Sequence, residues 1–153
     1  IRLRVKDWEF AHHFSECLAK ALNKKVKKPR LDTTGKWDVQ YYSKAFVCWY
    51  KHVREDLEKL RPYVEYGKET VRMFLRGLYD AEGTHYRCGR KEKISLYNTD
   101  KPLLCYVQRL LLRYFTIPAR LNKHSKYKKQ SWVLTIYGRG YSKIFLNEIG
   151  SRF

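Results

Sequence analysis

The stretch that decides the fold reads MFLRGLYDAEG and occupies residues 73–83. Phe74, Leu75 and Leu78 lie at the spacing of one helix face. We therefore expect a helix over residues 69–83 with an apolar stripe along it.

Two glycines predict how this helix packs and where it ends. Gly77 lies in its interior, where glycine costs about 1 kcal/mol relative to alanine unless close packing compensates. Gly83 follows the last acid and is expected to end the helix in a left-handed cap. We therefore expect a second helix to pack closely against Phe74, Gly77 and Leu78.

Two acids, Asp80 and Glu82, fall at the carboxyl end of the same helix. The helix dipole is negative there, so carboxylates are unfavourable unless a cation lies nearby. Hard oxygen ligands suit Mg²⁺. The acids predict a metal site, whereas the plain alternative is a glycine-capped helix with two solvated carboxylates.

A weak internal repeat flanks this helix. The string YSKAF at residues 42–46 recurs as YSKIF at residues 141–145. Each copy follows a strand, a helix, a basic segment and an alternating run led by Trp, which are residues 1–6, 10–23, 26–31 and Trp37, then 93–98, 103–115, 119–129 and Trp132. We expect a partial first repeat with a linker at residues 1–65 and a second repeat at residues 66–153.

The expected strands alternate with a period of two residues. Ile94 and Leu96 point one way, while Lys93, Ser95 and Tyr97 point the other. A helix opened by an Asp100 N-cap and Pro102 supplies part of the second layer. The pattern predicts an α+β fold with helices on one sheet face and a bare, basic opposite face.

The charge balance indicates a polyanionic partner, because 33 Lys and Arg stand against 15 Asp and Glu, a formal net charge of +18. Apolar runs are too short for a membrane span, so no membrane partner is expected. We expect an intracellular protein, in a prokaryotic cytoplasm or an organelle. Its cysteines lack zinc-site spacing and are expected to be reduced thiols, mostly in the core: Cys17, Cys48, Cys88 and Cys105.

Residues 75–83, LRGLYDAEG, resemble the motif of the LAGLIDADG homing endonuclease family, with departures at Arg76, Tyr79 and Glu82. The resemblance implies a duplicated αββαββα fold with saddle-shaped antiparallel sheets that grip the DNA major groove. It also implies that Glu82 and the carbonyl of Ala81 bind Mg²⁺ or another divalent cation over the minor groove.

The same resemblance implies further site residues. Lys6 is the candidate to orient the attacking water or to stabilise charge on the phosphate, and Asn98 occupies the matching position in the second repeat. The expected DNA-binding residues lie on the polar strand faces and nearby: Arg2, Arg4, Lys6, Lys36, Gln40, Tyr42, Arg87, Lys93, Ser95, Tyr97, Arg120, Asn122, His124, Lys126, Thr135, Tyr137 and Arg139.

Family members pair two motif helices, and this sequence contains one motif. We therefore expect the chain as given to begin inside its first repeat, without the first motif helix and first strand. The resemblance implies a monomer if that motif is present and a homodimer otherwise.

The function implied is site-specific, magnesium-dependent cleavage of both strands of a long duplex DNA site, by an intron-encoded enzyme. An intron RNA maturase or a cleavage-inactive DNA-binding regulator on the same fold is the alternative. A basic ribosomal or structural RNA-binding protein would explain the charge but not the motif.

Overall fold

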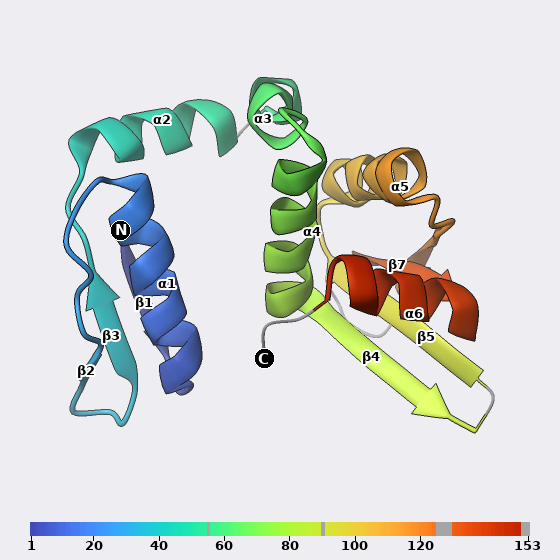
Figure 1. Cartoon of the computed structure of the whole chain (residues 1–153), viewed down its shortest axis with the longest axis horizontal. Coiled ribbons are helices and arrows are strands. Elements are labelled where there is room, and N and C mark those ends of the chain that lie inside the picture. Colours follow the sequence, from blue (N-terminus) through green and yellow to red (C-terminus); the bar gives the residue numbers. More distant parts are fainter. Residues whose placement is uncertain (55, 90, 125–129, 151–153) are drawn as a thin grey trace. The chain divides into compact units, whose positions relative to one another are not determined.

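The computed structural model describes residues 1–54, 56–89, 91–124 and 130–150. The chain forms two compact units, Ile1–Lys59 and Leu60–Arg152. The predicted repeat boundary after residue 65 stays a prediction, since compactness and repeat sequence are different criteria. Mixed helices and antiparallel sheets confirm the α+β class (Figure 1).

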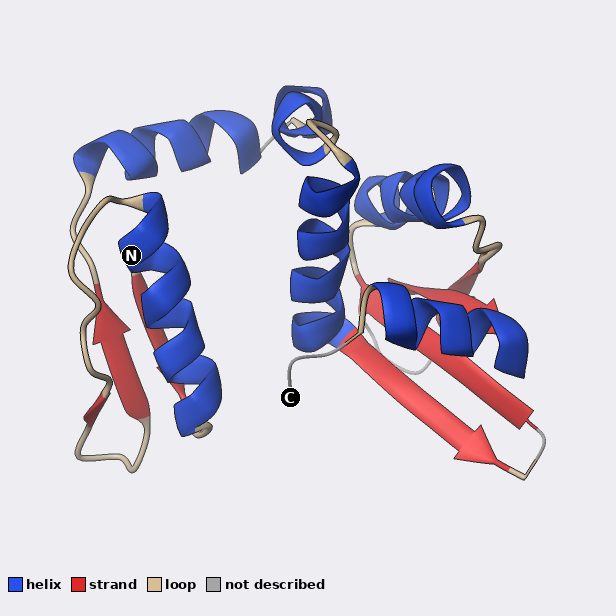
Figure 2. Cartoon of the chain, viewed as in Figure 1, coloured by secondary structure: helices blue, strands red, loops and turns tan. Residues whose placement is uncertain are grey.

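The first unit is a small sheet covered by one helix. Its strands pair antiparallel in the order β1-β3-β2. Helix α1 lies against one face of this sheet (Figure 2). Ala11, Leu18, Val39 and Tyr41 form the core of this unit. The elements are β1 (Arg2–Val5), α1 (Trp8–Ala21), β2 (Arg30–Leu31), β3 (Trp37–Gln40) and α2 (Lys44–Arg54).

The alternation expected in this sheet is confirmed. Cross-strand register puts Leu3 opposite Val39 on the helix-covered face and Arg2 opposite Gln40 on the open face. The covered residues are partly or fully buried, whereas Arg2 is exposed. The open face of the first unit is therefore the polar one.

Helix α3 (Leu57–Val64) leads into the second unit, whose antiparallel sheet has the order β4-β5-β7-β6. Helices α4, α5 and α6 contact this sheet, and Ile94, Leu96, Leu134 and Ile136 are buried beneath them. The elements are α4 (Lys68–Glu82), β4 (Gly83–Cys88), β5 (Lys91–Asn98), α5 (Lys101–Phe115), β6 (Arg120–His124), β7 (Ser131–Tyr137) and α6 (Arg139–Glu148).

The predicted start of α5 is confirmed. The Asp100 carboxylate accepts a hydrogen bond of 3.0 Å from the Leu103 amide, and Pro102 lies in the first turn. These interactions satisfy or remove amide donors that a helix start leaves without partners.

The expected cap at Gly83 is wrong. Gly83 has φ −88° and ψ 152°, which is extended backbone, and it begins β4 directly after the helix. A Cβ at this position would collide with the ring and carbonyl oxygen of Tyr79. Glycine is required here because the strand leaves the helix so tightly, not because of a left-handed turn.

The expectation that the cysteines mostly fill the core is also wrong. Cys17, Cys48 and Cys88 are exposed, Cys105 is partly buried, and all four are free thiols. Among the described residues, no helix has the length and apolar character needed to cross a membrane.

Candidate functional site

Glu82 is the last residue of α4, and its side chain is exposed. The helix is anchored because Val71, Leu75 and Tyr79 are buried. The Tyr79 ring packs edge-on against Phe145 of α6, with centroids 5.1 Å apart. The carboxylate is therefore presented from a packed helix rather than from a loop.

Glu82 and Asn98 line one open pocket of about 620 Å³. The pocket lies where the carboxyl end of α4 meets the ends of strands β5, β6 and β7. The Tyr97 ring meets His124 edge-on at a centroid distance of 5.1 Å. Among the described residues, the lining consists of Glu82, Thr84, Tyr97, Asn98, Thr99, His124 and Ser131.

The other two predicted catalytic residues, Asn98 and Lys6, belong to different units. The side-chain oxygen of Asn98 accepts a hydrogen bond of 2.9 Å from the Asp100 amide, so it also shapes the loop before α5. Lys6 is exposed directly after β1 in the first unit. Their catalytic roles stay predictions.

The oxygen atoms around Glu82 suit a hard divalent cation, and they would fill part of its coordination shell. The pocket combines one carboxylate with hydroxyl and amide oxygens of Thr84, Asn98 and Thr99. Within the described ranges, no group of three or more His, Cys, Asp or Glu side chains could hold a metal. Mg²⁺ tolerates this, because it keeps several waters and is bound through one or two carboxylates plus substrate phosphates.

The open face of the second sheet carries cations and aromatic rings. Register places Tyr86, Lys93 and Tyr137 side by side on this face. The Lys93 ammonium lies over the Tyr86 ring, 5.3 Å from its centroid. Arg120 and Asn122 of β6 share the face and are exposed. The sequence analysis did not single out Tyr86, although it is adjacent to the predicted Arg87 in the same strand.

Ser95 and Thr135 lie on this open face, but the expectation that they project from it is wrong. They are opposite each other in register and only 3% and 4% exposed. Their hydroxyl oxygens lie 3.4 Å apart. These short side chains are flanked along their strands by Lys93, Tyr97 and Tyr137, so they form the floor of the surface.

The expected placement of two further residues on the open strand face is wrong, while their contacts with DNA stay predictions. Arg87 is opposite Glu92, and both lie on the face that carries Ile94, away from Lys93. Arg139 is exposed but is the first residue of α6, because β7 ends at Tyr137 and Gly138 turns the chain with φ 96°. Neither side chain belongs to the open strand face.

On the first unit's open face, carboxylates hold two of the predicted arginines. Arg2 donates from Nε and Nη2 to the two oxygens of Asp38, at 2.8 and 2.6 Å. The Nε of Arg4 lies 3.5 Å from Asp32. The Arg2 hydrogen bond lowers the pKa of Asp38, while the Lys36 amide and the Thr34 hydroxyl lower the pKa of Asp32 to about 2.

A basic groove of about 510 Å³ borders this face. Gln40 and Tyr42, both predicted, line it, and Tyr42 is 69% exposed. The sequence analysis did not predict the cations of this groove as individual contacts, although the basic run at residues 26–31 was the available signal. These cations are Lys27, Lys28 and Arg30. Lys36 is exposed in the turn before β3, and Lys126 lies outside the described residues.

The predicted helix interface is exposed at its centre. A Cβ on Gly77 would meet nothing within 4 Å, and Met73 is exposed one turn earlier. Phe74 instead reaches the Tyr106 ring of α5, with centroids 6.1 Å apart. Pairing of this helix with a second motif helix stays a prediction.

Comparisons with known proteins agree with this geometry. The family model described as the LAGLIDADG-like domain matches residues 69–150, more than half of the chain. The chain belongs to the LAGLIDADG family. The family match spans the motif helix, the second sheet and the helices that cover it.

Solved structures share the LAGLIDADG fold. The structure of I-DmoI in complex with DNA and Mn has a TM-score of 0.69 and 21% identity, covering 100% of this chain and 81% of that chain. Full-length DUF199/WhiA from Thermatoga maritima has a TM-score of 0.59 and 17% identity, covering 97% of this chain and 47% of that chain. A comparison with curated protein sequences found no match.

Proposed function

We propose that this protein binds duplex DNA and hydrolyses its phosphodiester bonds as a divalent-cation-dependent homing endonuclease. The observation that carries the proposal is the exposed Glu82 carboxylate at the end of the packed motif helix, in one pocket with Asn98. Family membership and the fold shared with DNA-bound I-DmoI support it. An intron-encoded origin and cleavage of both strands are the finer parts of this proposal.

Glu82 and the carbonyl of Ala81 would hold the cation, with Mg²⁺, Mn²⁺ or Ca²⁺ as candidates because related structures contain them. When bound, such a cation activates a water and stabilises charge on the phosphate. The carboxylate binds and orients the ion. Asn98 is a neutral hydrogen-bonding group of the same pocket, and Lys6 is proposed as its cationic counterpart from the first repeat.

The open strand faces would hold the duplex. Lys93, Tyr137, Arg120 and Asn122 supply phosphate and base-edge contacts from the second sheet. A two-stranded ribbon fits the major groove, where base edges carry distinguishable hydrogen-bond patterns. Arg2, held by Asp38, offers a fixed guanidinium from the first sheet.

The test is cleavage of a supercoiled plasmid library carrying randomised target sites, with Mg²⁺, with Ca²⁺ and with EDTA. The proposal predicts linear product with Mg²⁺ and none with EDTA, and sequencing of the ends would identify the site. Binding to duplex DNA with every plasmid left intact would instead support a cleavage-inactive regulator. Binding confined to structured RNA would support a maturase.

The regulator alternative has a specific observation in its favour. The fold is shared with the N-terminal LAGLIDADG domain of DUF199/WhiA, at a TM-score of 0.59 and 18% identity. Glu82 favours the enzyme, because a protein that only binds DNA gains nothing from an exposed anion beside its binding face.

A further inference from the structure

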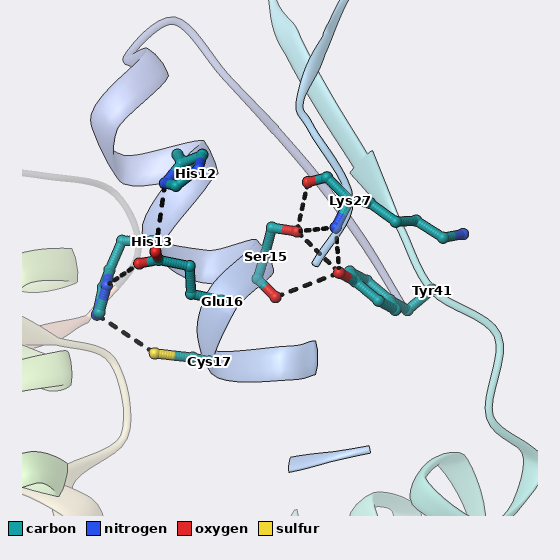
Figure 3. A network of polar contacts seen from close by, with 7 residues as sticks. All are labelled: His12, His13, Ser15, Glu16, Cys17, Lys27 and Tyr41. Atoms are coloured by element: carbon teal, nitrogen blue, oxygen red, sulfur yellow. Dashed lines mark hydrogen bonds and ion pairs between the residues drawn. The ribbon is translucent and has the colours of Figure 1, made fainter. Parts of the chain in front are cut away.

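Two hydroxyls are buried in the core of the first unit, and they hold a segment that has no secondary structure. Ser15 of α1 and Tyr41 after β3 are both 0% exposed, and their hydroxyl oxygens lie 2.8 Å apart (Figure 3). Buried hydroxyls without partners cost stability, so this pair must be satisfied by the chain around it.

The partners are backbone groups of the segment between α1 and β2. The Lys27 amide donates to the Tyr41 hydroxyl at 2.8 Å and lies 3.1 Å from the Ser15 hydroxyl. The Ser15 hydroxyl donates to the Lys27 carbonyl at 2.6 Å, and Tyr41 is 3.2 Å from the Lys25 carbonyl. Residues 24–29 form neither helix nor strand, so these hydrogen bonds replace regular pairing.

The anchored segment carries a row of cations. We call residues 24–30 the basic arm; its cations are Lys24, Lys25, Lys27, Lys28 and Arg30, all exposed. Pro29 is buried and fixes the arm against the unit.

Two arm lysines donate hydrogen bonds to backbone carbonyls at and after the end of β3. The Lys27 ammonium donates to the Gln40 carbonyl at 2.9 Å and lies 5.0 Å from the centre of the Tyr41 ring, while Lys24 donates to the Tyr42 carbonyl. Lys28 and Arg30 line the groove beside Gln40.

We propose that the basic arm binds one stretch of DNA phosphate backbone, and that Ser15 and Tyr41 are the positioning residues that hold it in register with the open face of the first sheet. This inference rests on the proposed function, since duplex DNA is the partner. Phosphate contacts fix the register of a protein on DNA, whereas base contacts read the sequence. The arm borders the open face, because Arg30 is opposite Asp38 in register.

A purely structural role for the hydroxyl pair would leave the phosphate count unchanged. Each neutralised phosphate contributes about 0.9 to the slope of log affinity against log salt concentration. Loss of Lys28 and Arg30 should therefore reduce that slope by about 1.8. If the hydroxyl pair positions the arm, loss of the pair should reduce the same slope. Removal of Lys28 and Arg30 in addition should then reduce the slope little further.

The experiment measures duplex DNA binding at several salt concentrations for the wild type, Tyr41→Phe, Lys28→Ala with Arg30→Ala, and the triple variant. Tyr50→Phe is the matched control, because Tyr50 is an exposed tyrosine of the same unit. The inference predicts a reduced slope for Tyr41→Phe, little further reduction in the triple variant, and a wild-type slope for Tyr50→Phe. Amide exchange at Lys27 should also accelerate in Tyr41→Phe, because the shorter of the two hydrogen bonds that this amide donates is lost.

Two results would overturn the inference while the proposed function stands. The first is duplex binding whose salt slope does not change in the Lys28 and Arg30 variant. The second is a wild-type slope in Tyr41→Phe despite a dependence on those cations. Ser15→Ala, which keeps the tyrosine, provides the same comparison if Tyr41→Phe does not fold. Failure of the wild type to bind duplex DNA would instead reject the proposed function, and the inference with it.

Discussion

The two open sheet faces use different means to hold their cations. In the first unit, Arg2 is hydrogen-bonded to Asp38, and Arg4 lies beside Asp32. In the second unit, no carboxylate lies on the open face of the described strands, since Glu92 is on the helix-covered face and pairs with His85 at 2.9 Å. Lys93 lies over the Tyr86 ring instead.

The two sheet faces are therefore suited to different kinds of contact with DNA. An arginine held by a carboxylate has a fixed direction but less net charge to offer a phosphate. A lysine over an aromatic ring keeps its full charge. The first face is thus suited to oriented contacts and the second to charge-driven contacts, while the candidate metal ligand Glu82 belongs to the second unit.

The largest expected effect tests the assignment of chemistry to the second unit. Glu82→Gln should reduce cleavage by about 100-fold or more, the scale for losing one preorganised electrostatic contributor, because the amide cannot supply the anionic ligand. DNA binding should persist, since the sheets are unchanged. Plasmid cleavage and binding assays measure both.

Glu69→Gln is the matched control for that variant. Glu69 lies in the first turn of the same helix, is 65% exposed in its side chain and pairs with Arg72 at 3.2 Å. The same loss of one charge should leave cleavage near the wild-type rate. Equal activity of the two variants would remove Glu82 from the site.

The next prediction compares how substitution of the two motif glycines changes the free energy of unfolding. Gly83→Ala should destabilise the protein by about 2 kcal/mol, within the range for overpacked positions, because its Cβ meets backbone as well as the Tyr79 ring. Gly77→Ala should stabilise it by about 1 kcal/mol, because a helical Cβ there meets open space. Urea unfolding of both variants provides the measurement.

The sign for Gly77→Ala is decisive for the predicted helix pairing. A stabilised variant means that this helix face stays uncovered in the protein tested. A destabilised, natively folded variant would mean that another backbone packs at Gly77, as the motif predicts, in a second copy or in a longer chain.

Periodicity predicted the elements well because it reports which face of an element is buried. Ile94 and Leu96 were placed correctly by alternation alone, and Asp100 by its capping chemistry. Glu82 was found through the motif, and the structure adds Asn98 to its pocket. These features depend on residues close in sequence, or on a pattern that any member of the fold must satisfy.

Other features depend on contacts that sequence spacing does not encode. Ser95 and Thr135 alternate correctly but are buried, because their side chains are shorter than those flanking them. Arg87 was assigned to the wrong face because the parity of β4 is set by its register with β5. The hydrogen bond from Lys27 to Tyr41 joins residues fourteen apart in sequence, so the fixed position of the basic arm could not be predicted.

A smaller effect tests the carboxylate-held face directly. Asp38→Asn should steepen the salt dependence of DNA binding by about 0.9, because Arg2 becomes free to neutralise a phosphate. Discrimination between target and unrelated DNA should fall at the same time, because the guanidinium loses its orientation. Glu92→Gln should change neither property, since Glu92 lies on the other face. An unchanged slope in Asp38→Asn would contradict this, because it would show that releasing Arg2 adds no phosphate contact.

The smallest effect concerns acid titration of the first face. Hydrogen bonds hold the folded pKa of Asp32 at about 2, below its ordinary value of 3.8, and the pKa of Asp38 is lowered as well. A depressed carboxyl pKa contributes stability that is present above the ordinary value and is lost as pH falls through the folded value. The ion pairs should therefore persist as pH falls below 4 and disappear towards pH 2. Carboxyl NMR titration should show this, and Arg2→Ala should raise the pKa of Asp38 while leaving Asp32 low, because the Lys36 amide and Thr34 hold Asp32 independently. An Asp38 pKa that does not respond to Arg2→Ala would contradict the proposed difference between the two faces.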